Sequence, residues 1–236
     1  MDFLITDEQK QLQDLIHQFI QKDYPFDVRD KLVKSEDGFS KEFWKTFSQF
    51  GLLAMPFSEE DGGFNGGPVD IMIILEAFGT GLIVEPYIPN IVLSGNLVSK
   101  LGNKEQKEAI LPNLLSGDMQ LAFAFSEPQS RFDLNDVTTL AEKKGSDFKL
   151  NGFKSVVMNG PAADKLIISA RTAGSQLDEN GISLFIVDRE TKGVSLRDYS
   201  NIDGSKASEL TLEDVVLTED ALLGEQDKAF STIEEV

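Results

Sequence analysis

Few side chains in this sequence could carry chemistry by themselves. The chain has no cysteine, which excludes disulfides, thiolate zinc sites, iron–sulfur clusters and cysteine nucleophiles. Its one histidine, His17, lies on a helical pattern far from other candidate groups, which indicates a surface or boundary residue. Asp133 and Asp136 could bind a metal ion, but no third ligand has the spacing to join them, so we assign no metal site. The glycines of residues 56–68 form no phosphate-binding motif and predict a tight turn.

Charge narrows the classes of partner. The 236 residues include 40 acidic and 22 basic side chains, which gives a formal net charge of −18 at pH 7. A field of this sign repels phosphate backbones and anionic lipids, which argues against nucleic-acid and membrane-surface partners. The N-terminus carries acidic residues where a targeting peptide needs basic ones, and no apolar run is long enough to span a bilayer. We therefore expect a cytoplasmic protein.

The elements that must position any site begin with a helical region. Thr6 and Gln9 form a capping box that precedes an apolar stripe at helical spacing. Ser40 opens a second helix, whose aromatic residues, Trp44 among them, are expected in the core. Gly117 ends the helical region. Further helices are expected over residues 69–80, 89–101 and 104–116.

After Gly117 the sequence changes to short segments rich in valine, isoleucine and phenylalanine. Turn signals such as Asn151-Gly152 and Asn180-Gly181 separate these segments. Seven strands are expected, over residues 119–125, 137–141, 147–150, 154–158, 165–170, 182–187 and 209–217. Many short strands at this spacing are typical of an antiparallel sandwich or barrel.

Helices first and strands second, without alternation, predict an α+β fold: an N-terminal all-helical domain followed by an antiparallel β-sandwich or barrel domain. We expect the helical domain over residues 1–117 and the β-domain over residues 118–222. Residues 223–236 are expected to begin a further helical domain. Within them Ala229, Ile233 and Val236 have the spacing of an amphipathic helix of barely two turns, which is marginal unless it packs on something. We therefore expect the natural protein to continue into a further helical domain.

Three segments together resemble the acyl-CoA dehydrogenase family. Residues 101–117 resemble its G-x-x-x-Q-K-x-x-x-L-P-x-L-x-x-G stretch. They run into Ala122-Phe-Ala-Phe-Ser-Glu-Pro128, which is similar to its flavin-binding A-x-T-E-P signature. Asn151-Gly-Phe-Lys154 with Asn159-Gly160 resembles its N-G-x-K-x-W-I-T-N-G block. Weaker similarities cover the rest of the chain in order and spacing.

The resemblance implies an N-terminal helical domain, a middle β-domain that forms a wall for flavin and acyl-CoA, and a C-terminal helical domain missing here. Members are oxidoreductases of fatty acid and lipid metabolism that remove an α-proton and a β-hydride from an acyl-CoA thioester, with FAD accepting the hydride. Their base is a glutamate of the C-terminal domain, so we assign no catalytic residue and expect this fragment alone to be inactive. Glu127 is expected to brace the backbone. The helix from Ile91 to Val98 is expected to line the acyl tail.

Five positions carry the flavin contact that the resemblance implies. Ser126 keeps the hydroxyl that meets the flavin pyrimidine, Phe125 offers its backbone amide, and Phe123 takes the place of an aromatic residue beside flavin and thioester. Val156 and Met158 stand where the family has a tryptophan that shields the flavin face and a threonine that bonds its N5 edge. The loss of that stacking surface costs on the order of 1 kcal/mol, and Met158 keeps only its backbone groups for the ring.

Two further positions depart from the family pattern and are expected to bind substrate. Arg131 stands where the family has a glycine, and Phe132 where it has a serine that bonds pyrophosphate or CoA. Arg131 either fills the pyrophosphate space or supplies a cation to a CoA phosphate.

Three interpretations stay open. The full-length protein is an FAD-dependent acyl-CoA dehydrogenase, a supporting subunit of a heteromeric dehydrogenase in which FAD is weakly bound or absent, or an acyl-CoA-binding module without redox chemistry. The implied partners are the acyl-CoA substrate, a homo- or hetero-oligomer of acyl-CoA dehydrogenase-like subunits, and an electron-transfer flavoprotein. The dehydrogenase interpretation requires residues 122–133 and strand 154–158 to lie together as one wall.

Overall fold

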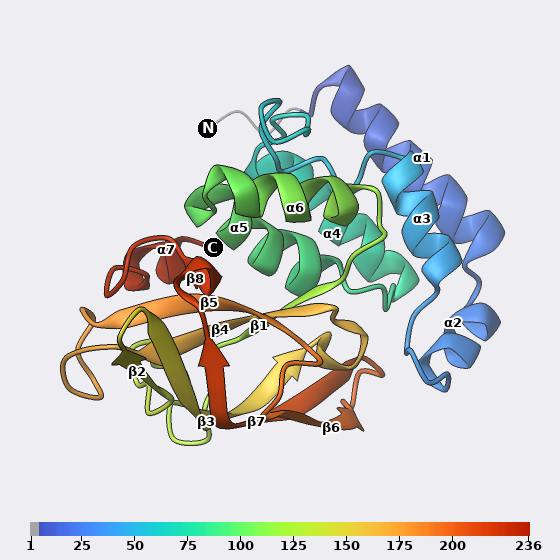
Figure 1. The fold of residues 1–236 in the computed structure, drawn as a ribbon. Coiled ribbons are helices and arrows are strands. Elements are labelled where there is room, and N and C mark those ends of the chain that lie inside the picture. Colours follow the sequence, from blue (N-terminus) through green and yellow to red (C-terminus); the bar gives the residue numbers. More distant parts are fainter. Residues whose placement is uncertain (1–4) are drawn as a thin grey trace. The chain divides into compact units, whose positions relative to one another are not determined.

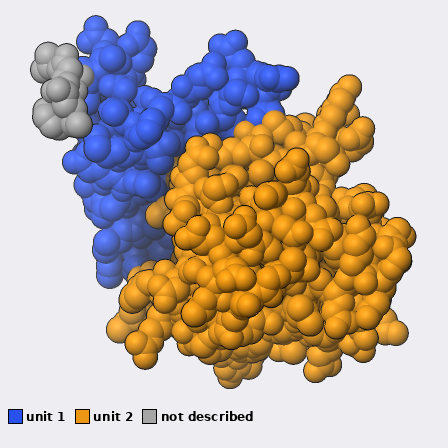
Figure 2. All heavy atoms as spheres, turned by 90° about the vertical axis from the view of Figure 1, so that its left-hand side faces the viewer, with its two compact units in different colours: residues 1–85 blue, residues 86–236 orange. Residues whose placement is uncertain are grey.

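The computed structural model describes residues 5–236. The chain forms two compact units, residues 1–85 and residues 86–236 (Figure 2). The division falls before the change from helices to strands, so the second unit contains several helices as well as the whole sheet. Within the described residues, every helix is too short or too polar to cross a lipid bilayer.

Helices make up the first unit. They are α1 (Asp7–Asp23), α2 (Phe26–Val33), α3 (Lys41–Gln49) and α4 (Pro68–Gly81). The capping box at the start of α1 is confirmed, since Gln9 N donates to Thr6 Oγ1 at 3.2 Å and Thr6 N donates to Gln9 Oε1 at 3.0 Å. Ser40 caps α3 by accepting from Phe43 N, also as predicted. Helix α2 was not predicted, because it buries none of its residues and has a weak apolar face.

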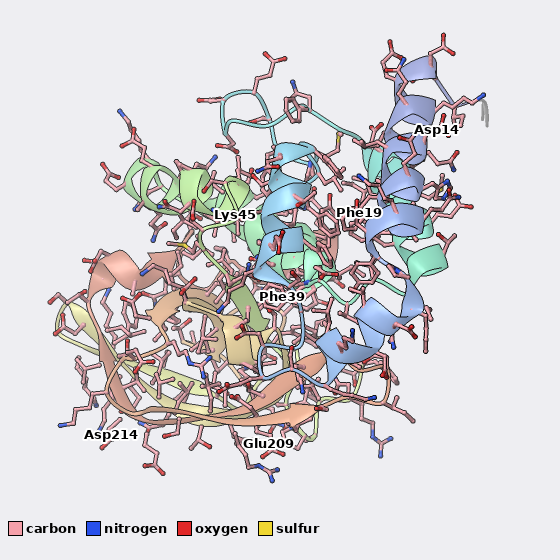
Figure 3. All side chains as sticks on the ribbon, turned by 90° about the vertical axis from the view of Figure 1, so that its right-hand side faces the viewer. Asp14, Phe19, Phe39, Lys45, Glu209 and Asp214 are labelled. Carbon is pink, nitrogen blue, oxygen red and sulfur yellow. The ribbon has the colours of Figure 1, made fainter. Side chains whose placement is uncertain are left out.

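Aromatic rings form the centre of this unit. The Phe19 ring packs edge-on against Phe43 and Phe47, with centroid separations of 5.2 and 5.3 Å. Phe47 also stacks on Phe78 at 5.0 Å. Trp44 is 1% exposed, so it is a core residue as expected. Figure 3 shows Phe19 directed from α1 into the unit.

The glycine-rich segment before α4 is the tight turn that the sequence predicts. Gly63 N donates to Ser58 O and Gly66 N donates to Met55 O, both at 2.7 Å. A Cβ atom on Gly63 would lie 2.2 Å from Phe57 O, so this close approach requires glycine.

The helices of the second unit include a nine-residue π-helix. The predicted helix over 89–101 is the π-helix η1 (Tyr87–Gly95) followed directly by α5 (Asn96–Leu101). The others are α6 (Lys104–Leu115), α7 (Phe230–Glu235) and the 3₁₀ turns η2 (Gly160–Ala162) and η3 (Glu219–Ala221). Asn90 anchors η1 to the sheet, because its amide accepts from Leu121 N and donates to Gln120 Oε1, both at 2.8 Å.

Among residues 5–236, eight strands form one sheet with the order β6-β7-β3-β2-β4-β5-β8, and β1 pairs with β4 (Figure 1). They are β1 (Leu121–Ala124), β2 (Leu140–Lys144), β3 (Asp147–Met158), β4 (Lys165–Arg171), β5 (Ile182–Asp188), β6 (Val194–Ser200), β7 (Lys206–Leu217) and β8 (Leu222–Leu223). The pairs are antiparallel except β1 with β4 and the single β2–β4 contact. The predicted class, helices followed by a mostly antiparallel sheet, is confirmed.

The sheet folds over a core filled from several strands. Buried side chains of this core include Ala122, Phe148, Leu150, Phe185 and Leu210. In Figure 1, β4 and β5 pass above β3 and β7, and all four of these strands contribute buried side chains to the core.

Two predictions about the strands were wrong. Asn151-Gly152 is not a turn, because it lies within the continuous strand β3, where the register with β7 shifts between Leu150 and Gly152. A Cβ on Gly152 would lie 2.5 Å from Thr139 Oγ1, so the glycine allows a close approach at a bulge. Strand β6 was missed because its charged and polar residues hide a half-buried alternation.

Candidate functional site

The chain at the end of β1 lies against strand β3, as the dehydrogenase interpretation of the sequence requires. Ser155 N donates to Ser126 O at 2.9 Å, and the hydroxyls of these two serines lie 3.3 Å apart. Lys154 Nζ reaches Phe125 O at 3.4 Å. The segments 122–133 and 154–158 therefore form one continuous surface.

Two aromatic side chains occupy one face of this surface. Side chains alternate along a strand, so Ala122 and Ala124 enter the core of the sheet while Phe123 and Phe125 lie on the opposite face. Their ring centroids are 4.9 Å apart with the planes tilted by 35°. Phe123 is 5% exposed and Phe125 is half-buried. The structure thus packs the Phe123 ring, which the resemblance places beside a flavin, against the ring of Phe125, for which only a backbone contact was expected.

The residues of β3 alternate in the same way near its end. Val157 is buried in the core, whereas Val156 is 41% exposed and Met158 is half-buried. Val156 is directed away from the core and offers two methyl groups where the resemblance predicts a large aromatic ring.

Arg131 and Phe132 lie in the turn that follows Ser126. Phe132 is 97% exposed, and Arg131 is exposed as well. The backbone of Arg131 has φ +50°, in the left-handed region that glycine adopts without steric cost. The turn thus has a conformation suited to the glycine of the family, although an arginine occupies it.

A buried ion pair lies directly behind the surface. Glu127 is 2% exposed and Lys154 is wholly buried, and their Oε1 and Nζ atoms are 2.8 Å apart. Glu127 Oε1 also accepts from Thr139 N at 3.0 Å, and Oε2 accepts from Thr138 N and Gln129 Nε2 at 2.9 Å each and from the Thr138 hydroxyl. Glu127 braces the backbone as predicted, because two of its donors are main-chain N–H groups.

Charge and burial shift both members of this pair. Burial acts to raise the pKa of Glu127, but the Lys154 ammonium and the hydrogen bonds outweigh it and lower that pKa to about 2. Burial lowers the pKa of Lys154 to about 8, against the attraction of the Glu127 charge. Near neutral pH the pair is ionised, with a negative oxygen and a positive nitrogen held inside the sheet.

A second buried cation, the Arg171 guanidinium, binds the backbone of the loop that contains Asn135. Arg171, 5% exposed, donates to the carbonyls of Asp178 and Asn180 through Nη1 and to those of Asn135 and Gln176 through Nη2, at 2.8–2.9 Å. Asn135 lies four residues after Arg131 in the same loop, so this guanidinium holds the end of that loop in place. Sequence reasoning missed the roles of Lys154 and Arg171; the lysine of the N-G-x-K motif was the one available signal.

Comparison with known proteins matches this geometry. The family model for the acyl-CoA dehydrogenase N-terminal domain matches residues 6–118, and that for the acyl-CoA dehydrogenase middle domain matches residues 122–215. The chain belongs to the acyl-CoA dehydrogenase family. The segment with the flavin signature lies within the middle domain of this family member.

Individual relatives agree with this assignment. Mitochondrial isovaleryl-CoA dehydrogenase of Pongo abelii is 31% identical over 95% of this chain and 54% of its own length. The caffeyl-CoA reductase–Etf complex subunit CarC of Acetobacterium woodii is 29% identical over 96% of this chain and 60% of its own. The structure of butyryl-CoA dehydrogenase from Megasphaera elsdenii has a TM-score of 0.83 and 28% identity, covering 98% of this chain and 62% of that one. The chain therefore spans less than two thirds of the length of these relatives.

Proposed function

We propose that the whole protein is an FAD-dependent acyl-CoA dehydrogenase and that residues 5–236 supply its helical part and its flavin wall. The observation that carries the proposal is the hydrogen-bonded junction of Ser126 with Ser155, which holds the flavin signature against its partner strand. Bound FAD would accept a hydride from the β-carbon of the acyl chain. The residues of this chain bind and orient the ring.

The residues present fit an isoalloxazine. Ser126 is half-buried and carries a hydroxyl that can donate to a pyrimidine oxygen, and Phe125 contributes its backbone amide. Phe123 and Phe125 provide an apolar face of two adjoining rings. Val156 and Met158 add aliphatic surface at the end of β3. We assign the flavin contact to these five residues, with side-chain bonds from Ser126 alone.

The substrate contacts follow from the exposed turn and the π-helix. Arg131 is exposed and carries a cation in a chain of net charge −18, which makes it a local attractor for a CoA phosphate. Phe132 is almost fully exposed and offers a flat surface beside it. The apolar side chains from Ile91 to Val98 are the proposed lining of the acyl tail. The CarC relative is named as a subunit of a reductase–Etf complex, which supports an electron-transfer flavoprotein as a partner.

A second candidate function is a supporting subunit beside a flavin-loaded partner. It is favoured by Val156, where 41% of the side chain is exposed at the place of a shielding ring. The Phe132 side chain, 97% exposed, is likewise free to be covered by another subunit.

Flavin content of the whole purified protein tests these alternatives. The dehydrogenase predicts a yellow protein with about one equivalent of FAD per chain and bleaching on addition of an acyl-CoA. A colourless protein that acquires flavin only with a co-expressed partner identifies the supporting subunit. Affinity for CoA esters without flavin in any assembly contradicts both and identifies a binding module.

A further inference from the structure

We infer that Lys154 is a positioning residue for the flavin: its buried ammonium orients and polarises the Phe125–Ser126 peptide so that the Ser126 N–H becomes a strong donor toward the ring. The inference rests on the proposed function, since it assigns a role to a residue behind the flavin wall. It concerns a side chain that does not itself reach the wall's surface.

Contacts with β3 and with Lys154 fix the orientation of the Phe125–Ser126 peptide. Lys154 Nζ lies 3.4 Å from Phe125 O, so this carbonyl is directed toward the buried ammonium, while Ser126 O accepts from Ser155 N of β3 at 2.9 Å. The chain contains no cis peptide among its described residues. In a trans peptide the C=O and the following N–H point in opposite directions. The Ser126 N–H is therefore directed away from Lys154, and within residues 5–236 it has no hydrogen-bond acceptor.

The positive charge of Lys154 acts on the same peptide. A wholly buried ammonium acts with little screening by solvent, and hydrogen bonds in a chain polarise one another. A positive nitrogen at Phe125 O draws electron density from the peptide and makes the Ser126 N–H a better donor. Such a donor favours the flavin form with the greater negative charge on its pyrimidine, which is the reduced form.

Neighbouring hydrogen-bond acceptors hold the Lys154 ammonium in place. Lys154 Nζ also donates to Glu127 Oε1 at 2.8 Å and to Ser169 Oγ at 3.0 Å, so three acceptors fix its position. Glu127 belongs to the same turn as Ser126, and its charge makes the burial of the lysine tolerable. The pair thus keeps a cation against one selected peptide.

The experiment uses the whole protein with three substitutions. Lys154→Met removes the cation at similar length. Lys154→Met combined with Glu127→Gln removes both charges, which avoids a lone buried carboxylate, and the glutamine keeps one acceptor oxygen for the backbone N–H groups of the turn. Lys149→Met is the matched control, because it makes the same change on the same strand at a lysine paired with an exposed partner, Asp214.

The first measurement needs no flavin. A hydrogen bond to the carbonyl of one residue shifts the amide ¹⁵N resonance of the next, so the Ser126 signal of the apoprotein reports the Lys154 contact. We expect this signal to move in both Lys154 variants and to stay in place in Lys149→Met. An unmoved Ser126 resonance in the Lys154 variants overturns the inference, whether or not the protein binds FAD.

The second measurement is flavin affinity and reduction potential. Both Lys154 variants are expected to bind FAD about tenfold more weakly, with a more negative potential, and Lys149→Met is expected to match the wild type. If the double variant regains wild-type affinity and potential, Lys154 serves only to neutralise Glu127 and the inference is wrong. A wild-type protein that never binds FAD refutes the proposed function instead, and the ¹⁵N result still decides whether Lys154 polarises the peptide.

Discussion

Each of the two units buries a glutamate, and the two glutamates behave in opposite ways. Glu85, 5% exposed, accepts from Ser40 N at 3.2 Å and is hydrogen-bonded by Tyr24, while its Oε2 has no partner among the described residues. Glu127, 2% exposed, has a lysine and a set of hydrogen-bond donors around both oxygens. Burial raises the pKa of Glu85, whereas the lysine and the donors lower that of Glu127 to about 2. Partners, rather than depth, decide in which direction the pKa of a buried carboxyl group moves.

The largest effect on stability is expected from removing Glu127, the buried carboxylate that is paired with Lys154. Glu127→Ala leaves the Lys154 ammonium buried without a counter-charge and removes the acceptor of two backbone N–H groups. We expect a loss of about 3–5 kcal/mol in the free energy of unfolding. Urea denaturation measures it, with the exposed Glu142→Ala on β2 as control. Equal stability of the two variants would show that the buried pair contributes nothing.

A smaller effect is expected from the bulge beside this cluster. A Cβ at residue 152 would lie 2.5 Å from Thr139 Oγ1, and Thr139 N donates to Glu127. Gly152→Ala is expected to cost about 1–3 kcal/mol through overpacking. Gly145→Ala is not a matched control, since its φ is +67°. Gly79→Ala in helix α4 adds a methyl group with nothing within 4 Å, so it has no packing cost and is expected to gain about 1 kcal/mol in helix propensity. Thermal unfolding of both variants separates packing from backbone effects.

The pH dependence of the free energy of unfolding is expected to have opposite signs at Glu127 and at Glu85. The folded pKa of Glu127 lies below the ordinary 4.5, so its ionisation stabilises the fold above that pH, and this contribution is lost as the pH falls from about 4.5 toward 2. The stability advantage of the wild type over Glu127→Gln is therefore expected to shrink across this window. Urea unfolding at a series of pH values measures the difference. A constant difference down to pH 2 would contradict the prediction.

Glu85 is expected to show the reverse. Its folded pKa is raised above 4.5, so the fold loses stability relative to the unfolded chain as the pH rises past that value. Glu85→Gln removes this cost and is expected to gain stability at pH 7, with no gain below pH 4.5. Calorimetry at the two pH values checks the sign. A gain that persists in acid would come from packing rather than ionisation.

The smallest effect is expected at an exposed pair. Lys149 Nζ and Asp214 Oδ1 are 2.8 Å apart on the outer side of the sheet, where Figure 3 shows Asp214 directed outward. Solvent and salt screen such a pair, so Lys149→Met is expected to leave the unfolding midpoint unchanged. A clear shift in denaturant unfolding would show that surface charge matters more here than burial.

Much of the fold could be predicted because local chemistry decides it. Thr6 and Ser40 cap their helices through contacts within three residues, and apolar periodicity locates most strands. The meeting of residues 122–133 with strand 154–158 was predicted through a family resemblance, since no local pattern links segments so far apart; the hydrogen bond between Ser126 and Ser155 that joins them was not predicted. Strand β6 and the Asn151-Gly152 bulge escaped prediction because tertiary pairing overrode their local signals.

The burial of Lys154 and the backbone conformation of Arg131 could not be predicted from the sequence, for a related reason. Lys154 looks like an ordinary charged strand residue until the turn at Glu127 closes over it. The left-handed backbone of Arg131 is equally invisible, because arginine has no preference for it. Both features depend on long-range packing that fixes a side chain or a dihedral against its usual tendency.

The conformation of Arg131 also bears on how this protein could change over evolutionary time. Its main chain already follows the path that a glycine would take. An arginine codon becomes a glycine codon through a single base change, and that exchange would remove the side chain without rebuilding the turn. Lineages can thus gain or discard a cation at this place in one mutational step.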